Sequence, residues 1–209
     1  MRAAVLSFHS ALGSARRWRP LEQTDRTISA MELAVLVVLG VGSAVASAVM
    51  TRGLKIPGHN IVRVVLPMAL GLALVPRRGS ASVMGVGGLA GGTVITLAGV
   101  RGLGFGAATS LAVTGFIMDL ALIGARSGRS IYVRLALAAV AANMLAFLAK
   151  ASEKLWFPKP MEGQPFWEWL PKAIVSYPVC GILAGLIGAA ACFRFTAGPR
   201  AAPKGEDAA

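Results

Sequence analysis

Charged residues are scarce in this sequence of 209 residues. They make up 14% of the chain, whereas a soluble domain usually carries about 25%. Hydrophobic residues reach 56%, and the mean hydropathy is +0.67. This balance excludes an ordinary soluble enzyme and predicts one integral membrane domain.

Cysteine and histidine are also rare. Cys180 and Cys192 lie in one apolar segment, about 18 Å apart along a helix, which is too far for a disulfide. The absence of a CxxC pair argues against a structural zinc site or a redox pair. The two histidines, His9 and His59, are distant in sequence, so we predict no metal site.

Motifs for nucleotide and hydrolytic chemistry are missing as well. There is no Walker phosphate loop, so the chain is not itself an ATPase, and there is no GxSxG or HExxH. We therefore expect neither an enzyme nor a cofactor. The net charge of +12 comes from bases between apolar runs, which indicates anionic lipid as the partner and not nucleic acid.

Apolar runs of about 20 residues are what a membrane-spanning helix requires. Six such runs predict an all-α bundle of six transmembrane helices, at residues 31–50, 61–76, 80–100, 104–125, 131–149 and 173–195. Residues 1–30 form a basic segment that we interpret as a flexible arm, or as residues ahead of a later start at Met31. We expect the tail, residues 196–209, to be disordered.

The distribution of Lys and Arg predicts the orientation. With six spans, the side that holds both termini carries twelve of these residues in its arms and loops, and the other side carries seven. By the positive-inside rule, both termini are then cytoplasmic. The expected location is the inner (plasma) membrane, with several passes.

On this topology three connections face outward: residues 51–60, a short turn at Arg101, and the long segment 150–172. The last is rich in aromatic residues, including Trp167 and Trp169. It is either an interfacial aromatic belt or a lid over a pocket, and the two tryptophans could serve both roles from opposite faces.

Polar residues gather at the predicted outer ends of the helices. His59, Asn60 and Arg63 lie at the start of the second span, where Asn60 could instead cap the helix. Asn143 lies near the middle of the fifth span, and Tyr177 and Ser110 lie in the outer halves of theirs. We predict that Asn143 and Tyr177 contact a ligand together with His59, Asn60, Arg63, Arg101 and Trp167, although hydroxyl groups often bond to helix backbones.

Asp119 is an acid inside an apolar run, so it requires a partner or a proton. Arg134 is the expected partner in a structural ion pair, and a proton relay is the alternative. The first span carries small residues, with Ala44 and Ala48 four positions apart, a spacing that lets another helix approach closely. That helix belongs either to the chain itself or to another protein.

The six short spans, the AxxxA of Ala44 and Ala48, and the loops after the first, third and fifth spans resemble the substrate-binding S component of energy-coupling factor transporters. Residues 56–85, IPGHNIVRVVLPMALGLALVPRRGSASVMG, are similar to uncharacterised members of that group. The resemblance implies that Ala44 and Ala48 meet a transmembrane coupling protein driven by two ATPase subunits. It also implies that the outer loops bind substrate.

The function expected from these features is a membrane subunit that binds a small water-soluble nutrient, such as a vitamin or its precursor. One alternative is a self-sufficient carrier or channel that uses Asp119 and Arg134. Another is a membrane enzyme that uses His59. A transition-metal uptake subunit is less compatible, because the chain lacks the Met-His start of the metal-transporting members.

Overall fold

The computed structural model describes residues 27–49, 56–99, 104–125, 128–157 and 165–193. Most of the predicted arm, the whole predicted tail and Arg101 lie outside these ranges. Within them, every regular element is a helix. The helices are α2 (Ala30–Val49), α3 (Ile61–Leu74), α4 (Ser80–Leu97), α5 (Phe105–Leu122), α6 (Gly128–Trp156) and α7 (Phe166–Cys192).

The predicted all-helical bundle is confirmed, with one difference. Five of the six described helices are long and apolar enough to cross a membrane, which indicates a multi-pass membrane protein. The exception is α3, which has 14 residues and is therefore about 21 Å long, less than the roughly 30 Å of a bilayer core. Pro76 follows α3 closely and cannot continue it.

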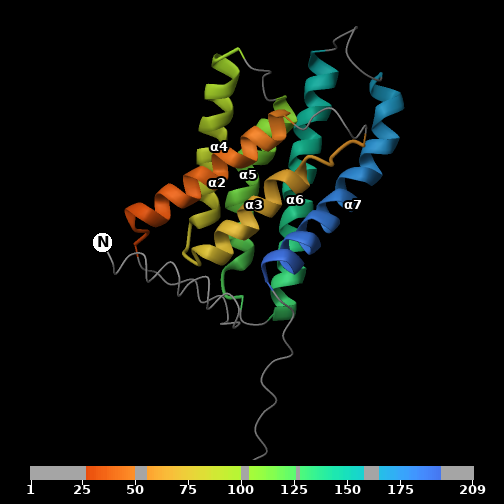
Figure 1. Cartoon of the computed structure of the whole chain (residues 1–209). Coiled ribbons are helices and arrows are strands. Elements are labelled where there is room, and N and C mark those ends of the chain that lie inside the picture. The colour runs from red at the N-terminus through yellow and green to blue at the C-terminus, as the bar shows by residue number, and fades with distance from the viewer. Residues whose placement is uncertain (1–26, 50–55, 100–103, 126–127, 158–164, 194–209) are drawn as a thin grey trace, which may run out of the picture.

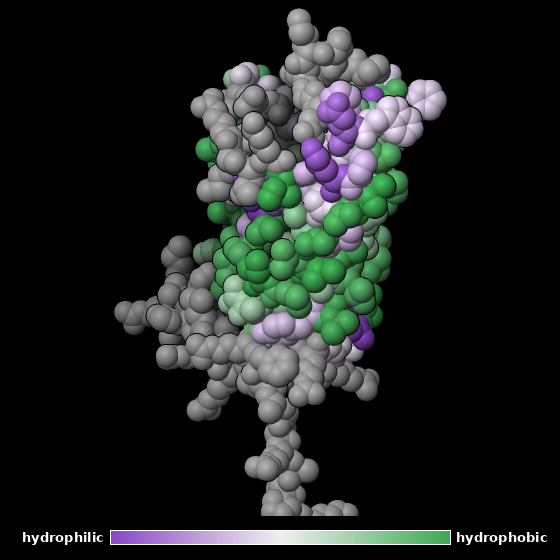
Figure 2. Space-filling view, turned by 90° about the vertical axis from the view of Figure 1, so that its right-hand side faces the viewer, coloured by the Kyte–Doolittle hydropathy of each residue, from purple (hydrophilic) through white to green (hydrophobic). Residues whose placement is uncertain are grey.

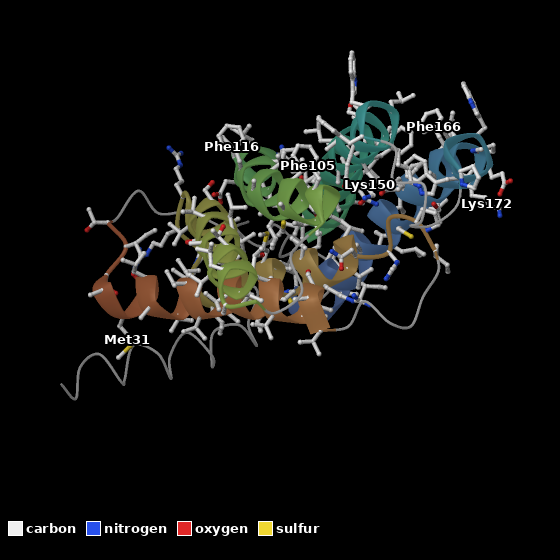
Figure 3. All side chains as sticks on the ribbon, turned by 90° about the horizontal axis from the view of Figure 1, so that it is seen from above. Met31, Phe105, Phe116, Lys150, Phe166 and Lys172 are labelled. Atoms are coloured by element: carbon white, nitrogen blue, oxygen red, sulfur yellow. The ribbon has the colours of Figure 1, made fainter. Side chains whose placement is uncertain are left out.

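The outside of the bundle is apolar, as lipid contact requires. Val38, Val86 and Leu137 are 69%, 70% and 63% exposed. Figure 2 shows a broad hydrophobic band, with hydrophilic residues gathered near its upper edge. Seen from above, Met31 and Phe116 point away from opposite sides of the bundle (Figure 3).

The helices pack as a closed ring in the order α2, α4, α5, α6, α7 and α3, with α3 also in contact with α2. The most extensive contacts join α6 with α7, α2 with α4, and α5 with α6. In Figure 1, α2 runs obliquely across the bundle, whereas α4, α5 and α6 stand upright. The end of α2, the starts of α5 and α7, and the ends of α4 and α6 lie towards the upper end, whereas α3 starts lower in the bundle.

Glycines permit three close helix contacts. A Cβ on Gly40 of α2 would collide with the Met84 carbonyl of α4, and one on Gly115 of α5 would collide with the Ala81 carbonyl of α4. A Cβ on Gly185 of α7 would lie 2.5 Å from the Ala136 Cα of α6. These glycines bring backbones together, as small residues do in membrane helices.

The prediction of a long loop at residues 150–172 is wrong over most of its length. Helix α6 continues to Trp156, and α7 already begins at Phe166. The aromatic and charged residues there lower the hydropathy, but most are compatible with a helix. Pro165 directly precedes α7, where a missing backbone N–H costs nothing.

The start of α2 is held by a capping box. The Ser29 backbone N–H donates to Glu32 Oε2 at 2.8 Å, and the Glu32 N–H donates to Ser29 Oγ at 3.3 Å. Glu32 also pairs with Arg77, which lies just before α4, at 3.2 Å. Ser29, which the prediction assigned to the arm, therefore belongs to the helical domain.

A candidate binding cavity at the upper end of the bundle

The short length of α3 leaves the chain before it deep in the bundle. The Asn143 side-chain N–H groups donate to the carbonyls of Gly58, at 3.2 Å, and Tyr177, at 2.7 Å. Asn143 lies 13 residues before Trp156, so Gly58 is held about 20 Å below the upper end of α6. Gly58 has a φ of +80°, and a Cβ there would lie 2.9 Å from Tyr177 Cγ, so only glycine suits this position.

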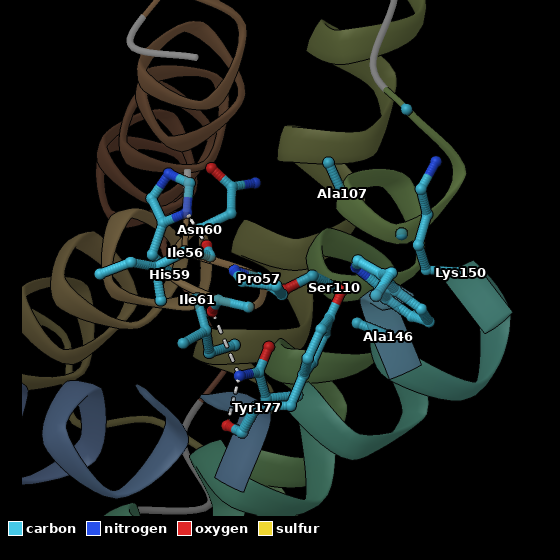
Figure 4. Close-up of a pocket in the computed structure, with 15 residues that line it drawn as sticks. Ile56, Pro57, His59, Asn60, Ile61, Ala107, Ser110, Ala146, Lys150 and Tyr177 are labelled. Carbon is cyan, nitrogen blue, oxygen red and sulfur yellow. Dashed lines mark hydrogen bonds between the residues drawn. The ribbon is translucent and has the colours of Figure 1, made fainter. Parts of the chain in front are cut away.

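Above this turn lies a cavity of about 260 Å³. Its walls come from the segment before α3, from the first turns of α5, from the upper part of α6 and from α7 (Figure 4). The residues that line it are Ile56, Pro57, Gly58, His59, Asn60, Ile61, Gly104, Gly106, Ala107, Ser110, Asn143, Ala146, Lys150, Trp169 and Tyr177. Segments far apart in sequence thus share one chamber.

Two polar atoms of the cavity wall lack a hydrogen-bond partner among the described residues. His59 Nδ1 bonds to the Ile56 carbonyl, but its Nε2 is buried and unpartnered. Ser110 is 3% exposed, and its Oγ is also unpartnered. Buried polar groups are nearly always bonded, so both atoms are suited to a ligand or to water.

Two of the three predicted residues at the start of α3 line the cavity. His59 and Asn60 do, whereas Arg63 contacts it only through Asn60, because Arg63 Nη1 donates to Asn60 Oδ1 at 3.3 Å. The alternative cap role for Asn60 is not realised, since its side chain makes no capping bond to α3. Arg63 therefore orients the amide of Asn60.

The aromatic wall uses Trp169 and not Trp167. Trp169 is 7% exposed and stacks on Phe147 with ring centroids 5.7 Å apart. Lys154 Nζ lies 5.6 Å from the Trp169 ring centroid. Trp167 is 76% exposed, does not line the cavity and contacts Phe166 instead. Trp167, which we predicted as a ligand contact, therefore lies outside this cavity, and Trp169 lines it instead.

A single cationic side chain lines the described part of the cavity. Lys150 Nζ pairs with Glu153 Oε2 at 2.6 Å, one turn further along α6. An ammonium has three donors, so this bond leaves others available. Figure 4 shows Lys150 on the side of the cavity opposite His59.

The predicted ion pair between Asp119 and Arg134 is not formed. Asp119 accepts from the backbone N–H groups of Ala81 and Ser82, at 3.2 and 2.7 Å, and from Ser82 Oγ at 2.6 Å. It therefore caps α4 from α5, where the helix dipole stabilises a negative charge. Arg134 instead donates to the carbonyls of Ala121 and Ile123 at the end of α5, at 2.9 and 2.6 Å.

The small-residue face of α2 is an internal one. Ala44 is fully buried and Ala48 is half-buried. The buried face of α2, which includes Gly40 and Ala44, packs on α4. The predicted partner contact through Ala44 is therefore corrected to an intramolecular one in this conformation.

The structure places His59, Asn60, Asn143 and Tyr177 around one cavity, together with residues that the sequence analysis did not select. Lys150 and Trp169 lay in the supposed loop. Helical spacing would have found them, because Lys150 follows Asn143 by two turns and Trp169 precedes Tyr177 by two turns.

The described residues contain no cluster of three His, Cys, Asp or Glu side chains placed to hold a metal ion. The fold and the cavity define a class: a multi-pass helical membrane protein with a small cavity at one end, mostly apolar but with a few polar groups in its wall. No family model, curated protein or solved structure matches the chain.

Proposed function

We propose that the chain is a membrane-embedded binding subunit that captures a small water-soluble nutrient for uptake, in line with its resemblance to the S components. The observation that carries the proposal is the cavity. The segment before α3, the start of α5, and facing parts of α6 and α7 converge on a cavity of about 260 Å³, whose mostly apolar and aromatic lining carries a few polar groups. This volume is below the roughly 300–1,000 Å³ of pockets for drug-sized ligands, so the nutrient is small.

The position of the cavity supports capture from the outer face. By the predicted orientation, the upper end in Figure 1 faces outward. Below the Gly58 turn the bundle is filled by fully buried apolar residues such as Val65, Met68 and Leu135. Because these packed residues lie below the cavity, release to the other side requires rearrangement of the helices. A coupling protein with ATPase subunits would supply the energy for that step.

The alternative of a self-sufficient carrier loses its main support. Asp119 is bonded by three donors at the start of α4, and Arg134 is bonded to two carbonyls. Neither residue lines the cavity. They serve as structural links between helices.

Copurification tests the proposal. The full chain, purified in mild detergent, is expected to retain a small molecule that mass spectrometry detects at up to one copy per chain. Ala107→Phe places a ring in the cavity and should abolish retention. Ala112→Phe, on the exposed side of the same helix, is the matched control. Equal retention by the two variants would contradict binding in this cavity.

A further inference from the structure

The hydrogen-bonding pattern of the cavity wall restricts the chemistry of its ligand. His59 provides the first constraint on the ligand. The Ile56 carbonyl can only accept a hydrogen bond, so Nδ1 of His59 carries the hydrogen that joins them. In the neutral ring, Nε2 is then a bare acceptor, and it is buried without a partner among the described residues. A ligand atom that bonds here must donate.

A second acceptor lies on the same wall. The Asn143 amide uses its N–H groups on the Gly58 and Tyr177 carbonyls, which leaves its side-chain oxygen as the remaining polar atom. Asn143 lines the cavity beside the segment that holds His59. This wall therefore favours N–H or O–H groups on the ligand.

The opposite wall has donors. Lys150 lies across the cavity from His59, and Ser110 lies between them (Figure 4). The Ser110 hydroxyl is unpartnered among the described residues, and Lys150 keeps donors beyond the one given to Glu153. Charge-assisted bonds from an ammonium to a carboxylate are stronger than neutral ones. This wall therefore favours an acidic group.

Aromatic rings complete the enclosure. Trp169 and Tyr177 both line the cavity and meet edge to face, with centroids 6.3 Å apart. A flat ligand can stack on either ring, and such contacts are favourable beyond the area they bury.

We propose that the cavity binds a small planar heteroaromatic acid, with an N–H or O–H donor directed at His59 Nε2 and its carboxylate directed at Ser110 and Lys150. This inference rests on the proposed function only in taking the cavity as the binding site. It adds which groups on the ligand donate and which are acidic, and how the ligand is oriented in the cavity.

The test uses three matched probes on the full chain in detergent: indole-5-carboxylate, benzofuran-5-carboxylate and indole-5-methanol. Affinity is measured by equilibrium dialysis. The indole acid should bind at least about tenfold more tightly than the benzofuran acid, because the latter leaves Nε2 unpaired. It should also bind more tightly than the alcohol, and Lys150→Met should remove that second preference.

Two variants of His59 test whether Nε2 is the atom that accepts the hydrogen bond from the ligand. His59→Asn places an amide near the Nδ1 position, which keeps a donor for Ile56, but it lacks an atom at Nε2. His59→Gln restores a polar atom there. The preference for indole over benzofuran should vanish in His59→Asn and return in part in His59→Gln. Each variant is first shown to keep the wild-type unfolding temperature within a few degrees.

Two results would overturn the inference: equal affinity of the folded wild-type chain for all three probes, including no binding at all, or an indole preference that survives in His59→Asn. A copurified nutrient without a donor or an acid would also overturn it and leave the proposed function intact. Conversely, the predicted probe preferences in a chain that retains no nutrient would uphold the inference and count against the proposed function.

Discussion

At the residue scale, the environment of a side chain decided its role more than its type did. Trp167 and Trp169 are two positions apart, but one faces outward and the other closes the cavity. Asp119 and Arg134 have opposite charges, but each satisfies the backbone at a helix end. An unpaired helix terminus and an unpaired charge are both costly inside an apolar bundle, so one charged side chain at a helix end can remove both costs.

Truncation of the two tryptophans should have unequal effects. Trp169→Ala removes a buried ring from contact with Phe147 and Tyr177, so we expect a loss of about 3–5 kcal/mol in unfolding free energy. Trp167→Ala should change it by less than about 0.5 kcal/mol, because the ring is mostly exposed. Denaturant unfolding in micelles measures both. A larger loss for Trp167→Ala than for Trp169→Ala would mean that Trp167, and not Trp169, is the buried ring.

Double-mutant cycles separate the two accounts of Asp119. Alanine at Asp119 and Ser82 should show a coupling energy of at least about 1 kcal/mol, because each removes a partner of the other. Alanine at Asp119 and Arg134 should be additive within about 0.5 kcal/mol. Unfolding free energies of the single and double variants provide the values. Strong coupling of Asp119 to Arg134, with none to Ser82, would support the ion pair instead.

At the element scale, glycines set the spacing of the helices, and the shortness of α3 creates the cavity. Hydropathy located the centres of the helices, because each needs a long apolar segment. It could not locate the ends of α6 and α7, since the residues there are amphipathic and suit either a loop or a helix. Those ends carry Lys150 and Trp169, so hydropathy alone did not assign these two residues to the cavity.

Alanine at two glycines of α2 tests the close packing on α4. Gly40→Ala should lower the unfolding free energy by about 1–3 kcal/mol, because the new Cβ collides with the backbone at Met84. Gly42→Ala is the control: nothing lies within 4 Å of its Cβ, and alanine favours a helix. Its stability should be unchanged or higher. Equal losses at both positions would mean that the inward face of α2 is assigned incorrectly.

At the scale of the whole molecule, the described helices combine an apolar exterior with a small cavity that has a few polar groups in its wall. The all-helical membrane fold followed from composition and run length alone. The cavity followed only in part, because His59 and Asn143 stand out as polar residues near apolar segments, whereas the contact that joins them depends on how deep α3 begins. Orientation in the membrane and the coupling partner stay predictions.

The central claim is that the chain binds its nutrient but requires partners to move it. The most direct test reconstitutes the purified chain alone in liposomes and follows the radiolabelled copurified molecule. The account predicts saturable binding near one molecule per chain and no further accumulation with time, in the presence or absence of a proton gradient. Time-dependent accumulation by the chain alone, abolished in Asp119→Asn, would contradict it and establish a self-sufficient carrier.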